Sequence, residues 1–259
     1  MIDVKYLMMV CSDGEASAES GEVIRREIPN WLAETERRGV RLAGHPLDEP
    51  ESGVAVRVRD SETLVTDGPF AETKELAGFD VIDCENLDEA IDIAAKHPVA
   101  WFHAIEVRPF APCGAVDAQA DDLSDVLAPV NSAAPAGTSR HMLLMHVDGI
   151  PASDAEEAAI VRDGDSWHDE RKRTGELIFA HALAPPEAAT TVRVRDGETL
   201  LSDGPFAESK EFIAGFAIVD VPDRDAAISA AAAHPLASYH YIDVRPFAEY
   251  PSGDDTVGE

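Results

Sequence analysis

The chain has 259 residues, which is enough for one large domain or for two domains of about 100–150 residues. Hydrophobic residues make up 45% and charged residues 27%, so the sequence can bury an ordinary core and is not disordered throughout. The 50 Asp and Glu against 21 Lys and Arg give a formal net charge of −29, and a surface of that sign argues against nucleic acid and anionic membranes as partners.

Hydrophobic periodicity predicts the elements of the first 110 residues. Residues 5–10 are apolar and β-prone, so we expect the chain to open with a strand and not with a secretory signal peptide. Residues 22–38 place apolar side chains among charges and stop at Gly39, which predicts an amphipathic helix. The remaining pattern predicts a helix at 87–96, with Asn86 as its N-cap, and strands at 40–44, 54–59, 63–66, 79–84 and 101–107. This order, β-α-β-β-α-β with an added strand or hairpin, is that of a ferredoxin-like α+β domain.

The same pattern is then written a second time. The string DGPFAETKE at 67–75 returns as DGPFAESKE at 203–211, 136 residues later. The string HPVAWFHAIEVRPF at 97–110 returns as HPLASYHYIDVRPF at 234–247, 137 residues later, so one residue is inserted near Ile213. The sequence therefore predicts four segments: a first copy (1–110), an acidic linker rich in Ala, Pro and Asp (111–138), a second copy (139–247) and an acidic tail (248–259).

The two copies can solve a problem that one copy has alone. A ferredoxin-like domain leaves one face of its sheet without helices, and this face has to be covered. Two copies in one chain can cover it by packing sheet on sheet, so we expect an internal, pseudo-dimeric α+β barrel. The linker has no aromatic residue and is expected to be flexible. Association of two such chains into a homodimer stays open.

The cysteines and the apolar runs bear on compartment and metal content. Cys11, Cys84 and Cys113 are too far apart for a CxxC motif or a Cys/His zinc site, so we expect reduced thiols and no metal. No apolar run approaches the roughly 20 residues that span a bilayer. We therefore expect a cytoplasmic protein.

The DGPFAETKE string, followed by a strand, a short helix and a final EVRPF, resembles the YCII-related superfamily and, within it, the DGPF-domain branch. The resemblance covers both copies over nearly their whole length. It implies a ferredoxin-like fold that pairs into a dimeric α+β barrel. It does not imply one reaction, because relatives of this barrel class include muconolactone-isomerase-like enzymes, cofactor-free monooxygenases and regulatory ligand-binding domains. It also suggests a link to an extracytoplasmic-function sigma factor.

Three histidines of the second copy have no histidine at the equivalent first-copy position: His141, His146 and His168, matched by Lys5, Val10 and Leu32. The resemblance implies that His168 forms an acid–base site with an Asp, for which Asp203 is the candidate. An imidazole beside a carboxylate can cycle protons near neutral pH, as isomerase or lyase chemistry requires. Only the second copy would keep this pair, since Leu32 replaces the histidine in the first. A lone surface histidine is the alternative.

Three further residues complete the candidate catalytic set: His181, its repeat partner His45, and Asp67, the counterpart of Asp203. The DGPF turn also has a structural explanation, because Asp, Gly and Pro each favour a tight turn. That explanation does not cover Lys74 and Lys210, which stand at equivalent positions in a chain with few lysines. A salt bridge to a neighbouring glutamate and a contact with a bound anion are the two interpretations.

Six arginines recur at matched positions: Arg57, Arg59 and Arg108 in the first copy, and Arg193, Arg195 and Arg245 in the second. On alternating strands they share a face with Glu106 or Asp243, so cross-strand ion pairing is one interpretation. If that face lines the space between the copies, the barrel holds a basic patch inside an acidic shell. Such a patch would suit a small anionic ligand, such as a carboxylate.

Two hypotheses for the function follow. The first is a small-molecule enzyme without a cofactor, performing isomerase- or lyase-like proton transfer. The second is a ligand-binding or regulatory module without turnover that acts with a sigma factor. A duplicated scaffold in which the motif is only a turn is the plainest reading.

Overall fold

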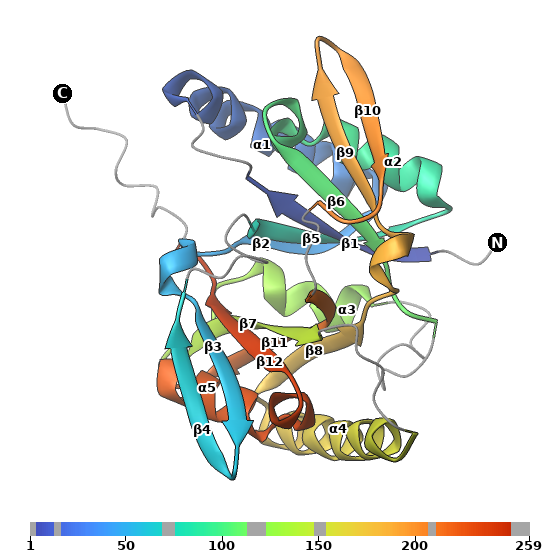
Figure 1. Ribbon diagram of the computed structural model, residues 1–259. Helices are drawn as coiled ribbons and strands as arrows, with labels where there is room; N and C mark the ends of the chain where they lie inside the picture. The colour runs from blue at the N-terminus through green and yellow to red at the C-terminus, as the bar shows by residue number, and fades with distance from the viewer. Residues whose placement is uncertain are drawn as a thin grey trace.

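The computed structural model describes residues 4–12, 17–68, 76–112, 123–147, 154–206 and 211–249. Within these residues the chain forms two six-stranded antiparallel sheets that pack face to face, with long helices on the outer faces (Figure 1). The α+β class expected from the sequence is confirmed. No helix in the described ranges is long and apolar enough to cross a membrane.

The first copy contains the elements that periodicity predicts, with ends that shift by a few residues: β1 (Val4–Cys11), α1 (Ala18–Arg38), β2 (Arg41–Pro46), β3 (Val54–Arg59), β4 (Glu62–Asp67), β5 (Leu76–Cys84), α2 (Leu87–Lys96) and β6 (Ala104–Pro109). Helix α1 ends because Gly39 adopts a left-handed conformation with φ of 69°. Helix α2 begins where predicted, since the Asn86 side chain accepts a hydrogen bond from the backbone N–H of Glu89.

The second copy repeats the order: β7 (Ser139–Val147), α4 (Asp154–Thr174), β8 (Leu177–Ala182), β9 (Thr190–Arg195), β10 (Glu198–Asp203), β11 (Phe212–Val221), α5 (Arg224–Ala233) and β12 (Tyr241–Pro246). A short helix, α3 (Ser124–Leu127), and a 3-10 turn, Ala128–Asn131, lie between the copies.

The two copies exchange a hairpin. The first sheet has the order β10-β9-β6-β1-β5-β2 and the second has the order β4-β3-β12-β7-β11-β8. The β9–β10 hairpin of the second copy therefore completes the first sheet, and the β3–β4 hairpin of the first copy completes the second; the two hairpins extend at opposite ends of Figure 1. The pairings Ile105↔Val192 and Ile242↔Val56 are equivalent, so the exchange obeys a pseudo-two-fold axis.

The space between the sheets holds a continuous core. It contains Leu7 and Phe79 of the first sheet together with Leu144 and Phe216 of the second, all exposed to solvent by 1% or less. Isolated β-bridges, Leu47↔Phe247 and Phe110↔Leu183, join the two sheets. The sheet-on-sheet, pseudo-dimeric barrel expected from the repeat is confirmed.

The expectation of a flexible linker is wrong for the part that the structure describes. Leu123, Leu127 and Val130 are at most 1% exposed and belong to the core between the sheets. The Asn131 amide donates to the carbonyl of Leu42 at 2.9 Å, while its oxygen accepts from the backbone N–H of Gly44 at 3.2 Å. Arg140 donates to three carbonyls of the same segment, those of Pro129, Val130 and Ser132. The linker is acidic in composition, yet its three apolar residues are enough to anchor it in the barrel.

Candidate functional site

The structure does not bring His168 and Asp203 together. His168 is buried on α4, whose neighbouring residue Trp167 packs into the core on the outer face of the second sheet. Asp203 ends β10, an edge strand of the first sheet, and is exposed. The pairing inferred from the resemblance is therefore not formed, because the hairpin that carries Asp203 has crossed to the other copy. The alternative of a solvated His168 is wrong too, since this residue is 6% exposed.

His45 and His181 lie where the two sheets join. The Nδ1–H of His45 donates to the Pro46 carbonyl at 2.8 Å, and that of His181 donates to the Ala182 carbonyl at 2.7 Å. Their rings stack on Phe247 and Phe110, with centroids 4.7 and 4.3 Å apart. Burial lowers the pKa of His45 below its usual value. Both histidines stabilise the barrel seam.

Four of the other predicted site residues have structural roles or lie outside the description. Asp67 is exposed at the end of β4, and its carboxylate is 3.4 Å from the guanidinium of Arg224. Arg59 donates to the carbonyls of Ser238 and Tyr239, and Arg195 makes the equivalent bonds to the carbonyls of Ala100 and Phe102. These bonds tie each exchanged hairpin to the turn of the other copy. Lys74 and Lys210 lie outside the described residues.

Arg57 belongs to a row of three side chains that crosses the second sheet. The pairing Ile242↔Val56 brings Arg57 of β3 alongside Tyr241 of β12, and Tyr241 pairs directly with His146 of β7. The Arg57 guanidinium carbon lies 4.7 Å from the Tyr241 ring centre, and the Tyr241 and His146 rings are 4.4 Å apart and nearly parallel, at 10°. We call these three residues the His146 row. They point into the space between the sheets, because Ile242 and Val56 face the helices.

His146 is the least satisfied polar group of this row. It has no solvent exposure, and neither ring nitrogen has a hydrogen-bond partner in the described structure. Burial, together with the positive charges of Arg57 and Arg108, lowers the pKa of His146 to about 3. The ring is therefore neutral and carries one N–H donor and one acceptor. A buried donor and acceptor without partners are costly, so such a site favours a ligand that can bond to them.

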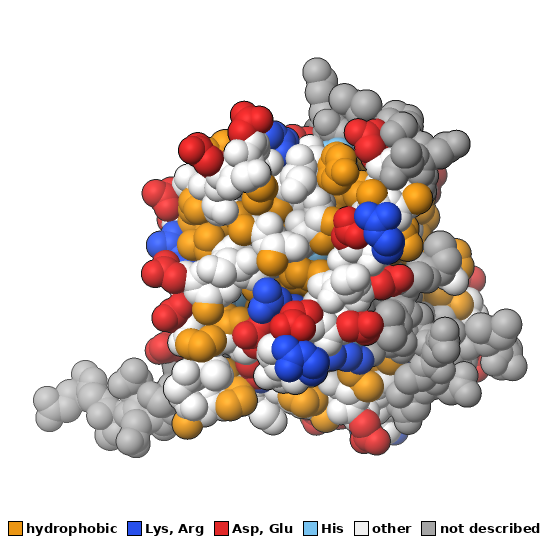
Figure 2. Space-filling model, turned by 90° about the horizontal axis from the view of Figure 1, so that it is seen from below, with side chains coloured by type: hydrophobic (Ala, Val, Ile, Leu, Met, Phe, Trp, Pro, Cys, Tyr) orange, Lys and Arg blue, Asp and Glu red, His pale blue; other side chains and the backbone are white. Residues whose placement is uncertain are grey.

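Two buried residues of the first sheet face the His146 row. Arg108 of β6 donates to the carbonyl of Ile213, the residue paired with His146, at 2.8 Å. Its other nitrogen bonds to the carboxylate of Glu106, whose second oxygen accepts from the backbone N–H of Phe206 at 2.9 Å. Two arginines and a neutral imidazole thus converge from both sheets. Figure 2 shows acidic side chains spread over the outer surface, so positive charge is held here behind an acidic exterior.

The pseudo-two-fold axis generates a second row with different chemistry. Arg193 of β9 lies alongside Ala104 of β6, which pairs with Cys11 of β1. We call Arg193, Ala104 and Cys11 the Cys11 row. Opposite it, Arg245 donates to the Leu76 carbonyl at 3.2 Å, as Arg108 does to that of Ile213. Position for position, tyrosine is replaced by alanine and histidine by cysteine.

The sequence missed both residues that distinguish the His146 row. A fixed offset matched His146 with Val10, whereas the ladders match it with Cys11, because β1 and β7 are offset by one residue fewer than the preceding motifs. The available signals were a histidine without a repeat partner and the change from Ala104 to Tyr241 in otherwise matched strings.

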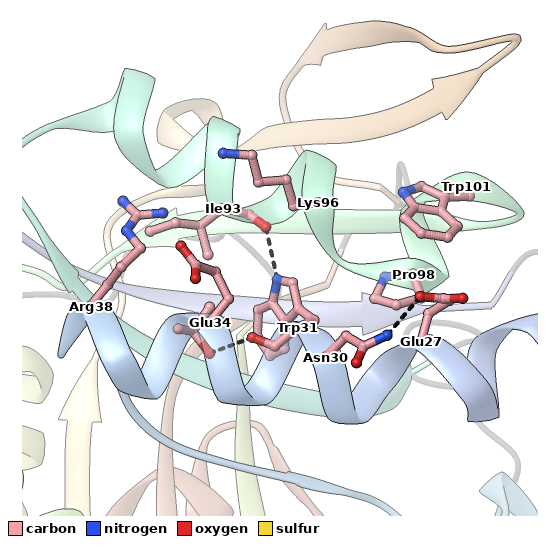
Figure 3. A pocket seen from close by; sticks show the side chains of 10 residues that line it. Glu27, Asn30, Trp31, Glu34, Arg38, Ile93, Lys96, Pro98 and Trp101 are labelled. Atoms are coloured by element: carbon pink, nitrogen blue, oxygen red, sulfur yellow. Dashed lines mark hydrogen bonds between the residues drawn. The ribbon is translucent and has the colours of Figure 1, made fainter.

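A separate pocket of about 200 Å³ lies between α1 and α2, on the outer side of the first copy (Figure 3). The Trp31 indole donates to the carbonyl of Ile93 there, and Lys96 is paired with Asp92. It is remote from both rows, which lie between the sheets. Among the residues that the structure describes, no group of three or more His, Cys, Asp or Glu side chains is placed to hold a metal.

Comparison with known proteins agrees with the internal repeat. The model of the YCII-related domain matches the chain twice, over residues 5–112 and 141–249. An uncharacterised protein of Rhizobium meliloti (strain 1021) is 35% identical over 106 residues, which cover 39% of this chain and 84% of that protein.

Two solved structures are similar over nearly the whole chain at very low identity. A candidate chlorite dismutase has 9% identity and a TM-score of 0.46, with 96% of each chain covered. A candidate monooxygenase from Lactobacillus acidophilus NCFM has 10% identity and a TM-score of 0.37, with 96% of this chain and 94% of that chain covered. At these scores the likeness says nothing about activity.

Proposed function

Because the chain belongs to the YCII-related domain family, we propose that it is a cofactor-free enzyme of the DGPF branch that performs isomerase- or lyase-like acid–base chemistry on a small anionic molecule. The observation that carries this proposal is His146, a fully buried imidazole with two unpartnered nitrogens between Arg57 and Arg108. The two guanidinium groups supply the charge that binds an anion, and the imidazole supplies the site for a proton.

Substrate binding and proton transfer are linked in this arrangement. Without a ligand, burial and two neighbouring cations keep His146 neutral and weakly basic. An anion placed between the arginines offsets their positive charge and raises the pKa of His146 toward neutrality. The imidazole then becomes an effective base only when the substrate is present. Tyr241, stacked on the ring, fixes its orientation.

The first test follows the His146 ring by NMR while formate is added. We expect its signals to shift on titration, and the shift of the other histidines to be smaller. His146→Gln should lose formate binding. His141→Gln is the matched control, because His141 is a buried histidine on the opposite face of the same strand. Unchanged His146 signals at saturating formate would remove the proposal.

Turnover is tested with the ligand that the protein retains. Native mass spectrometry of gently purified protein identifies the retained anion, and its conversion is then followed with wild type and His146→Gln. We expect conversion by wild type alone.

A ligand-binding or regulatory module linked to an extracytoplasmic-function sigma factor is the second candidate. It is favoured by the apolar side chains exposed on the two edge strands, Leu64 and Val65 on β4 and Leu200 and Leu201 on β10. Edge strands with exposed apolar residues are surfaces on which another protein can add a strand. Anion binding without turnover would favour this candidate. A cytoplasmic location remains part of the proposal under either function.

A further inference from the structure

Resting on the proposed function, we propose that the ligand is a monocarboxylate whose carboxylate replaces that of Glu211 on Arg57. Glu211 is the last residue of the second DGPFAESKE string and lies directly before β11. Its carboxylate is 3.5 Å from the Arg57 guanidinium, longer than the about 2.7–2.9 Å of a well-formed charge-assisted bond. A carboxylate thus already occupies this position, and it is loosely held.

The exposure of the two side chains makes this position the entrance to the His146 row. The side chains of Arg57 and Glu211 are 41% and 30% exposed, whereas Tyr241 is 2% exposed and His146 is fully buried. A ligand therefore meets Arg57 first. When it displaces the Glu211 carboxylate, its own carboxylate takes over the volume that this group leaves. The part of the ligand attached to the carboxylate then lies against Tyr241 and within reach of His146.

The charges around the row select a monoanion. Arg57 and Arg108 carry two positive charges, Glu106 carries one negative charge, and His146 is neutral. Once Glu211 has moved away, the net charge of the site is +1. A monocarboxylate neutralises it, while a dianion such as sulfate leaves an uncompensated negative charge beside buried groups, which is unfavourable.

The Cys11 row gives the expected stoichiometry. Arg193 packs over the ring of Phe206, at 5.1 Å, and the next positions are Ala104 and Cys11. It offers neither an aromatic wall next to the arginine nor an imidazole beyond it. We therefore expect one monocarboxylate per chain although the fold is two-fold repeated.

The experiment measures binding of propionate and of sulfate by isothermal titration calorimetry and by the NMR shift of the His146 ring. Wild type, Glu211→Gln and Glu198→Gln are compared. Glu211→Gln is nearly isosteric and removes the competing carboxylate. Glu198→Gln removes the same charge from β10, where every residue is exposed. We expect wild type to bind one propionate per chain, Glu211→Gln to bind it about fivefold more tightly, and Glu198→Gln to match wild type.

Each other outcome has a definite meaning. Equal propionate affinity in wild type and Glu211→Gln overturns the inference that Glu211 occupies the ligand position, while the proposed function stands. Sulfate binding as tight as propionate binding overturns the monocarboxylate class. If no variant binds either anion and the His146 signals do not shift, the proposed function itself fails. Circular dichroism and thermal unfolding of Glu211→Gln establish that any loss of binding is not a loss of fold.

Discussion

The His146 row and the Cys11 row occupy equivalent places in the two halves of the barrel, and they differ in the residues that can move a proton. Each row begins with an arginine on an exchanged strand and faces a buried Arg–carboxylate pair on the opposite sheet: Arg108 with Glu106 opposite the first, and Arg245 near Asp243 opposite the second. Only the His146 row adds a tyrosine and a histidine. The duplication has kept the frame in both halves and the ionisable ring in one.

The frame itself has a structural reason to be kept. Arg108 and Arg245 each bond to a backbone carbonyl at the start of an inner strand, those of Ile213 and Leu76, next to a register shift in the ladder. Irregular ladder positions leave backbone groups that need partners when buried. The repeated arginines are therefore explained by the fold, and the ligand-binding function is expected only where Arg57, Tyr241 and His146 are added to them.

The largest expected effect tests the shared frame. Arg108→Met and Arg245→Met each remove a buried guanidinium and leave a buried carboxylate and a carbonyl without their partner. We expect each variant to lose about 3–5 kcal/mol of unfolding free energy, measured by urea denaturation. A matched pair of losses supports a common frame. A large loss at one arginine with none at the other would show that the two halves are held together differently.

The next effect separates the rows by stability. His146→Leu removes a buried donor and acceptor that have no partners, so we expect the variant to be about 1–3 kcal/mol more stable than wild type at neutral pH while losing anion binding. The same replacement at Cys11 should give no such gain, because the Cys11 thiol already donates to the Met9 carbonyl. Urea denaturation of both variants measures the difference. A destabilised His146→Leu would mean that the ring is needed for packing rather than for function.

The sequence predicted most of the elements because hydrophobic periodicity and caps are local. Alternating valines mark β3 and β9, and Asn86 and Gly39 mark helix ends, whatever the rest of the chain does. The hairpin exchange was not predictable in this way. The two hairpins share the strings VRVRD and DGPFAE, so either sheet edge offers each of them the same local pairing. The choice is made by contacts between the copies.

That exchange also explains why the candidate site was only partly found. Pairing His168 with Asp203 assumes that the β9–β10 hairpin stays on its own sheet, but it lies on the other one. The arginines were recognised because they repeat. Tyr241 and His146 were missed because they interrupt the repeat, and comparing the two copies emphasises what they share. The apolar anchor in the linker was missed since three leucine and valine residues in an acidic stretch leave its average composition polar.

A smaller effect sharpens the comparison through pH. The pKa of His146 is about 3 in the folded protein and about 6.5 in an unfolded chain, so the unfolded state takes up a proton that the folded state excludes. Stability at His146 is therefore complete above pH 6.5 and declines by about 1.4 kcal/mol per pH unit as the pH falls toward 3. His146→Leu should flatten the fall of unfolding free energy with decreasing pH by this slope. Cys11→Leu should leave the slope unchanged. Equal slopes in all three proteins would show that His146 is charged in the folded state.

The smallest effect on stability is expected at the outer end of each row. Arg57 and Arg193 are half-buried and stack on aromatic rings, Tyr241 at 4.7 Å and Phe206 at 5.1 Å. Such a contact contributes about 0.5–1 kcal/mol at partly exposed sites, so Arg57→Gln and Arg193→Gln should each unfold within about 1 kcal/mol of wild type. Their binding should nevertheless differ. Arg57→Gln is expected to lose propionate binding, because it removes the charge that meets the carboxylate, whereas Arg193→Gln should bind as wild type does. Calorimetric titration of the two variants decides this. Equal loss in both would mean that the halves bind ligand alike, and that the histidine and tyrosine of one row do not set its function.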